Sequence, residues 1–215
     1  MMNWCSLPIA RAYAFALYVD QDMVSKIKGS TSSSAPADRM VAAKVESPQC
    51  GDVTLVLKMA RDIDGEHLAH GFFNSVSARW AKRTGAASAP TQASQPAEAT
   101  GANSEAPLAQ IRALADQFNG MKLAMGDEVA FRWHRDGTLH TTVQGGITPQ
   151  RAFVVRSTDV IAALFAVYVS EGAVSEEGRA TFDANLESMG GLQAAGQGDV
   201  SALLRPVVDR HVSER

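Results

Sequence analysis

Two histidines in the segment 64–80 are the first residues whose type and spacing could do chemistry. His67 and His70 lie three positions apart, which places both imidazoles on one face of a helix. A pair of imidazoles can bind a metal, but a stable site needs further ligands, and none stands at a useful spacing. A solvated helix face is the better interpretation, and we expect neither a metal site nor a cofactor.

Other polar groups have the spacing of ordinary strand and turn residues. Glu128 and Arg132 alternate with apolar residues, and 134–136 would form the tip of a hairpin. Gly145 and Gly146 lead into 147–149 (Ile-Thr-Pro), which is no phosphate-binding loop. The sequence contains no GxSxG motif and no Cys/His pair in a familiar context. Spacing alone therefore indicates no catalytic mechanism.

Composition excludes several classes of partner. The 215 residues carry 20 basic and 23 acidic side chains, a formal charge of -3, which favours neither nucleic acid nor an anionic membrane. The longest apolar run, 160–169, is shorter than the roughly 18 residues that a membrane-spanning helix needs. Cys5 and Cys50 have no metal-ligand or CxxC spacing, so a reduced compartment fits better than a structural disulfide. We expect a soluble monomer with no membrane span.

Alternation of side chains predicts the strands. The segment 11–20 has the clearest period of two, which would place its large apolar residues on one face and its alanines on the other. The segment 53–59 alternates in the same way, and 128–133 with 139–143 form a hairpin around Asp136-Gly137. Because the first strand begins so close to Met1, we expect a partner strand to be missing upstream, that is, a truncated N-terminus.

A period near four predicts the helices. One helix begins after Asp64, and others follow caps at Ser157 or Thr158 and at Ser175. The segment 84–107 is rich in Ala, Ser, Gly and Pro and is predicted to be a flexible insertion. One domain over 1–187, followed by a C-terminal tail over 188–215, is therefore expected. Strands and helices in this order predict an α+β fold in which a helical layer covers an antiparallel sheet.

Three segments together resemble the chalcone isomerase-like family. They are YAFALYVD at 13–20, GDEVAFRW at 126–133, and ALFAVYV at 163–169 followed by AVS at 173–175. They occur in the family's order, and the similarity spans about 11–186. The resemblance implies an open-faced β-sandwich: a large antiparallel sheet, a layer of helices and a ligand cleft between them.

The family includes enzymes that close a chalcone into a flavanone and non-catalytic members that bind fatty acids. The enzymes hold water on the substrate ketone with a strand Thr and a helix Tyr, near a Lys, an Asn and a second Thr. In this chain the corresponding positions hold Tyr13, Leu68, Gly71, Ser75 and Val167. Leu and Val cannot donate a hydrogen bond to a ketone or its water, so catalysis of this kind is not expected.

Tyr13 favours the binding members of the family, in which a tyrosine and an arginine of the preceding strand hold a carboxylate. That arginine would lie at or before Met1, so Arg11, two residues before Tyr13 on the same strand face, is the substitute that the sequence offers. A phenol and a guanidinium would orient a carboxylate while an apolar cleft takes the tail. The alternative is that Arg11 is solvated and Tyr13 is an ordinary core residue.

The sequence thus favours a non-catalytic protein that binds a fatty acid or a similar apolar carboxylate. The alternatives are an intramolecular lyase that closes a chalcone or polyketide-like ligand through a rearranged site, and an interaction module. The resemblance implies a plastid location if a transit peptide is missing upstream, and the cytoplasm otherwise. The expected ligand-binding residues, lining the cleft or the core behind it, are Arg11, Tyr13, Phe15, Leu17, Leu68, Phe72, Ser75, Leu164 and Val167.

Overall fold

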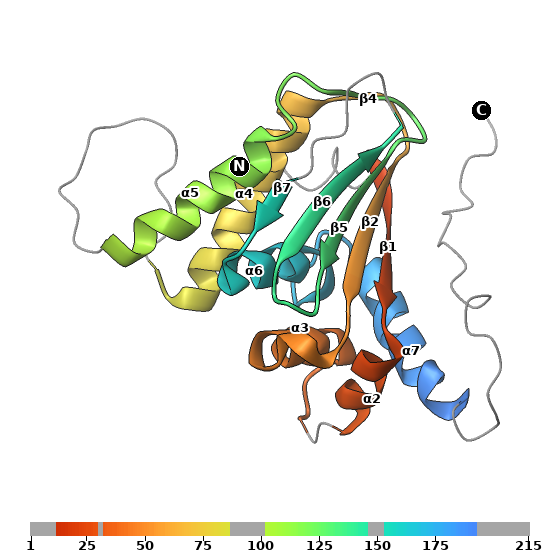
Figure 1. Ribbon diagram of the computed structural model, residues 1–215. Helices are drawn as coiled ribbons and strands as arrows, with labels where there is room; N and C mark the ends of the chain where they lie inside the picture. The colour runs from red at the N-terminus through yellow and green to blue at the C-terminus, as the bar shows by residue number, and fades with distance from the viewer. Residues whose placement is uncertain (1–11, 30–31, 87–101, 146–152, 193–215) are drawn as a thin grey trace, which may run out of the picture.

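A five-stranded antiparallel sheet organises the protein (Figure 1). The computed structural model describes residues 12–29, 32–86, 102–145 and 153–192. The strand order is β1 (Tyr13–Val19), β2 (Val53–Met59), β5 (Glu128–Trp133), β6 (Leu139–Gln144) and β7 (Phe153–Val155). In the register, Phe15 of β1 lies opposite Leu57, and Leu55 of the same strand β2 lies opposite Phe131. The predicted strands are confirmed.

Helices cover one face of this sheet. They are α2 (Gln21–Gly29), α3 (Pro36–Glu46), α4 (Gly65–Thr84), α5 (Ala102–Asp116), α6 (Thr158–Val169) and α7 (Glu176–Leu192), with a short 3-10 turn η1 (Pro48–Cys50). The central one is α6, whose residues 160–169 are all buried. It lies behind β5 and β6 in Figure 1, where the Phe165 ring packs 5.4 Å from that of Trp133. The predicted α+β fold, with its antiparallel sheet under a helical layer, is confirmed.

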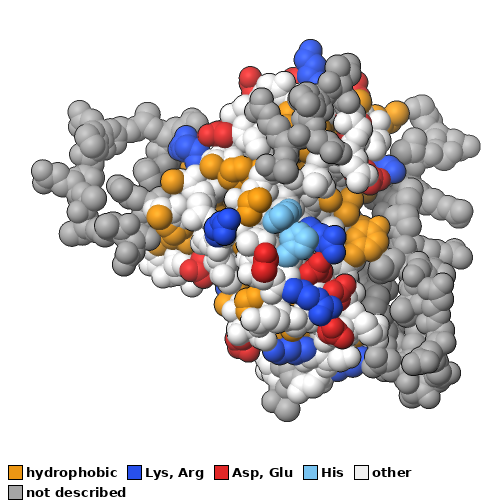
Figure 2. All heavy atoms as spheres, viewed as in Figure 1, with side chains coloured by type: hydrophobic (Ala, Val, Ile, Leu, Met, Phe, Trp, Pro, Cys, Tyr) orange, Lys and Arg blue, Asp and Glu red, His pale blue; other side chains and the backbone are white. Residues whose placement is uncertain are grey.

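The other face of the sheet is uncovered by the described residues and carries charge. Lys58 and Glu128, on neighbouring strands, lie 3.2 Å apart, and Arg132 pairs with Asp52 at 2.7 Å. The rings of His134 and His140 lie 4.4 Å apart. Histidine, basic and acidic side chains gather on this face in Figure 2. Opposite charges across neighbouring strands are the ordinary solvated pairs of an exposed sheet face.

Local signals in the sequence fix several helix ends. Ser157 caps α6, because its side chain accepts a hydrogen bond from the Val160 N–H. The Ser175 hydroxyl likewise accepts from the Gly178 N–H at 3.0 Å, at the start of α7. Such caps satisfy N–H groups that have no partner within the helix.

A two-stranded ribbon, β3 (Ile63–Asp64) with β4 (Lys122–Leu123), is not predicted by the sequence pattern. Each strand has only two residues, which is too short for a periodic signal. The ribbon leads directly into α4, whose first residue, Gly65, packs against the backbone near Phe118. A Cβ atom at Gly65 would collide with the Phe118 carbonyl oxygen, so this approach of α4 requires glycine.

The predicted segment boundaries differ from the structure at two places. Helix α5 begins at Ala102, within the predicted insertion 84–107, and α4 extends to Thr84; residues 87–101 lie outside the described part. Helix α7 extends to Leu192, past the predicted start of the tail at 188, and 193–215 lie outside the described part. The partner strand expected upstream would precede Met1 and so lies outside the sequence, and residues 1–11 are not described. Among the described helices, none is long and apolar enough to cross a membrane.

Candidate ligand-binding cavity

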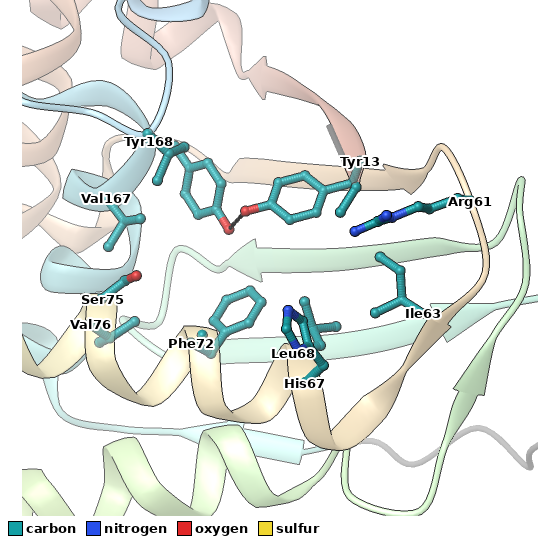
Figure 3. A pocket seen from close by; sticks show the side chains of 13 residues that line it. Tyr13, Arg61, Ile63, His67, Leu68, Phe72, Ser75, Val76, Val167 and Tyr168 are labelled. Carbon is teal, nitrogen blue, oxygen red and sulfur yellow. Dashed lines mark hydrogen bonds between the residues drawn. The ribbon is translucent and has the colours of Figure 1, made fainter. Parts of the chain in front are cut away.

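A cavity of about 40 Å³ lies between β1, α4 and α6 (Figure 3). Its position follows from the fold, because α4 and α6 pack on each other and the end of α6 meets the start of β1. Apolar side chains make up most of its wall. The lining residues are Ala12, Tyr13, Arg61, Ile63, His67, Leu68, Gly71, Phe72, Ser75, Val76, Val167, Tyr168 and Val174.

Two buried tyrosine hydroxyls meet at this cavity. Tyr13 comes from β1 and Tyr168 from the end of α6, and their oxygen atoms lie 3.2 Å apart (Figure 3). The ring of Phe15 packs 5.3 Å from that of Tyr168 and 5.4 Å from that of Phe182 on α7. These contacts hold the Tyr168 ring in place. The two phenols therefore form a fixed polar group in an otherwise apolar wall.

Both phenols are held in their neutral form. Burial raises the pKa of Tyr13, and its hydrogen bond with Tyr168 lowers that pKa by less. Burial also raises the pKa of Tyr168 well above the ordinary value, and the neighbouring Tyr13 raises it further. A neutral phenol keeps its O–H proton for donation. At neutral pH the pair is thus a hydrogen-bond donor without negative charge.

These raised pKa values predict a loss of stability in alkaline solution. A phenol is ionised above its ordinary pKa of about 10 in the unfolded chain and stays protonated in the fold. The contribution of the pair to the free energy of unfolding is therefore complete below about pH 10, and it is lost as the pH rises through the pKa of the folded state. We expect the free energy of unfolding in urea to fall from pH 9 to pH 11, and to fall less steeply in Tyr168→Phe. Equal slopes in both proteins would contradict this.

Arg61 stands at the mouth of the cavity, on the loop after β2. The N–H of the preceding residue, Ala60, donates to the Ala12 carbonyl at 2.9 Å, which fixes this loop beside the start of β1. Asp62, the next residue, accepts a hydrogen bond from the Met125 N–H at 2.8 Å. Figure 3 shows the Arg61 side chain pointing towards Tyr13. Within 12–29, 32–86, 102–145 and 153–192, no ion pair or hydrogen bond engages its guanidinium.

The sequence-predicted site residues divide into three groups. Tyr13, Leu68, Phe72, Ser75 and Val167 line the cavity. The second group, Phe15, Leu17 and Leu164, lies in the core behind it. Arg11 lies outside the described residues.

Sequence reasoning missed Arg61 and Tyr168. Arg61 follows the strand 53–59 as one charged residue in a polar loop, and only the pairing of β2 with β1 brings it beside Tyr13. Tyr168 lies in a helix that is apolar on every side, so periodicity could not separate it from the core. A signal was present in its hydroxyl, because a buried phenol requires a hydrogen-bond partner.

The two histidines of α4 have different surroundings. His67 lines the cavity mouth, whereas His70 is exposed and lies beside Asn74, with ring nitrogens 3.4 Å from the amide nitrogen. In the part of the chain that the structure describes, no three His, Cys, Asp or Glu side chains are arranged to hold a metal ion. Cys50 is a half-buried free thiol.

Comparison with known proteins supports the fold independently of the sequence pattern. No family model and no curated protein sequence matches it. Among solved structures, a fatty-acid binding protein from Arabidopsis thaliana matches with a TM-score of 0.60 and 18% sequence identity, over 83% of this chain and 79% of that one. The chain has the chalcone isomerase fold. At this level of identity the chalcone isomerase fold is shared, and the ligand has to be argued from the site.

Proposed function

We propose that the protein is a non-catalytic member of the chalcone isomerase fold that binds a fatty acid or a similar apolar carboxylate. The observation that carries the proposal is the neutral Tyr13–Tyr168 hydroxyl pair in an apolar cavity, with the guanidinium of Arg61 at its mouth. The matching Arabidopsis protein is described as a fatty-acid binding protein, which is consistent with this ligand class.

A count of donors in the tyrosine pair favours an anionic ligand. Each hydroxyl has one proton, and the bond between Tyr13 and Tyr168 uses only one of the two. The described residues offer no acceptor for the second proton. A carboxylate would accept this proton with one oxygen and would accept a hydrogen bond from Arg61 with the other. Both hydrogen bonds would be charge-assisted. Because both phenols are neutral, neither would repel the anion.

The remaining wall suits an alkyl chain. Leu68, Phe72 and Val76 follow one another along α4, and Val167 faces them from α6. One water needs about 10–15 Å³ of such a cavity, so its 40 Å³ holds a head group and little else. A long chain therefore requires the α4 and α6 side chains to move apart, or its end to reach the mouth. Either arrangement would bury alkyl groups against apolar side chains, which favours binding.

Purified protein should carry and respond to such a ligand. We expect mass spectrometry of organic extracts to detect a fatty acid, and we expect excess laurate to raise the melting temperature. Laurate at about a hundred times its Kd stabilises by about 2.7 kcal/mol, or roughly 5–10 °C for a chain of this size. No bound lipid together with no shift on adding laurate would contradict the proposal; dodecan-1-ol, which lacks the charge, serves as the control.

The tyrosine pair gives the lyase alternative its specific support, since a neutral phenol would also polarise a ketone. Closure of a chalcone would lower its absorbance faster than in buffer, and Tyr13→Phe would abolish that excess rate. A rate equal to that in buffer would leave binding as the function of the site.

A further inference from the structure

Gly71 lies in the middle of α4 and lines the cavity. Glycine inside a helix is disfavoured relative to alanine, because it has more backbone freedom to lose on folding. An ordinary helix face would therefore hold alanine or a larger residue at this position. The cavity explains the glycine, since any side chain at position 71 would occupy part of the cavity.

The direction of a side chain at position 71 follows from the helix geometry. Residues four apart lie on one face of a helix, and His67 and Ser75, the neighbours of Gly71 at that spacing, both line the cavity. A Cβ atom at Gly71 would thus project towards the same side. Figure 3 shows Phe72 of the same helix turn facing the Tyr13–Tyr168 pair across the cavity. A side chain at 71 would narrow the passage on that side.

Six residues of α4, over nearly three helical turns, line the cavity. They extend from His67 to Val76, a length of about 13 Å at 1.5 Å per residue. Bulky side chains border the cavity along this length, namely Leu68, Phe72 and Val76. Gly71 is the one lining position of α4 without a side chain, so it lies where the passage can be widest. A side chain at position 71 would therefore reduce the space that a ligand can occupy beside α4.

We infer that glycine at position 71 sets the width of the cavity. This width selects an unbranched acyl chain over a fused-ring acid of the same carbon number. The inference rests on the proposed binding of carboxylates. It assigns to Gly71 the selectivity for ligand shape, whereas Tyr13 and Arg61 would hold the head group.

Gly71→Ala tests this inference because it should move stability and affinity in opposite directions. Alanine improves the helix, which raises the melting temperature of the unliganded protein by about 2–4 °C. The added methyl group narrows the cavity, and the affinity for undecanoate should fall roughly tenfold. Calorimetric titration and thermal unfolding measure the two effects. Gly71→Leu should lose undecanoate binding while the protein still unfolds cooperatively.

Asn74→Ala is the matched control, since Asn74 is exposed on the same helix and does not line the cavity. It also improves helix propensity and should leave the undecanoate affinity unchanged. The second ligand is 2-naphthoate, which has the carbon number of undecanoate and should bind the unmodified protein more weakly. Equal affinities for both acids, or undecanoate binding unaffected by Gly71→Ala, would overturn the inference. If neither acid binds the unmodified protein, the proposed function itself fails.

Discussion

Replacing Lys44 by methionine is expected to lower the free energy of unfolding by about 2–4 kcal/mol. Lys44 lies on α3 and is fully buried. Its ammonium has three protons, and each has an acceptor: the carbonyl oxygens of Pro48 at 2.7 Å, Gly51 at 2.8 Å and His134 at 2.8 Å. It thereby ties the helical layer to η1 and to the tip of the β5–β6 hairpin. Methionine matches the shape of lysine but leaves three buried acceptors unpaired.

The charge of Lys44 is costly to bury and is held by its surroundings. Burial lowers the pKa of the ammonium, although the nearby Cys50 and Asp52 raise it. The Trp133 ring lies below it, with its centroid 5.4 Å from Nζ, which adds a cation–π contact. Removing the charge recovers part of the desolvation cost, so the expected loss is smaller than the sum of three hydrogen bonds.

Urea unfolding measures this prediction, with Lys26→Met as the control. Lys26 is exposed on α2, and its replacement should change the free energy of unfolding by less than about 0.5 kcal/mol. We expect the melting temperature of Lys44→Met to fall by roughly 5–15 °C. If the two variants unfold alike, the three carbonyls are satisfied in another way and the role given to Lys44 is wrong.

The second large effect concerns the head-group site. Arg61→Gln and Tyr13→Phe should each lower the affinity for laurate by about 10–100-fold, because a hydrogen bond to a charged group contributes about 1.5–3 kcal/mol. Arg61 is exposed, so salt screens its contribution, and its loss should fall at the lower end of that range. For the same reason, laurate should bind the unmodified protein more weakly at high salt, and Arg61→Gln should reduce this salt dependence.

Two comparisons make this prediction specific. Arg83→Gln removes an exposed charge from the far end of α4, away from the cavity, and should leave laurate binding unchanged. Arg11→Gln tests the arginine that the sequence suggested. If Arg11→Gln weakens laurate binding and Arg61→Gln does not, Arg61 is not the cation of the site. Dodecan-1-ol affinity should be insensitive to both arginine variants, because no charged bond is lost.

Most of the fold could be predicted from the chain because its signals are local. Alternation along 13–19 and 53–59 gives strands, and a four-residue spacing from Leu68 to Trp80 gives a helix, since each pattern reflects which side of one element is buried. The ribbon β3–β4 could not be predicted in this way. Its two-residue strands exist because Gly65 and the turn after Phe118 approach each other in space.

Only part of the candidate site could be predicted from the sequence, again because sequence signals are local. Tyr13 could be identified by itself, from its place in a strand with a clear period and from the resemblance. Its partner Tyr168 is 155 positions away, and the two hydroxyls meet only because α6 packs against β1. Arg61 enters the site because β2 pairs with β1 and ends beside Ala12. The sequence by itself determined the longer helices and strands and one phenol. The tertiary structure decided which polar groups face the cavity, since periodicity records burial and contains no information about contacts between distant elements.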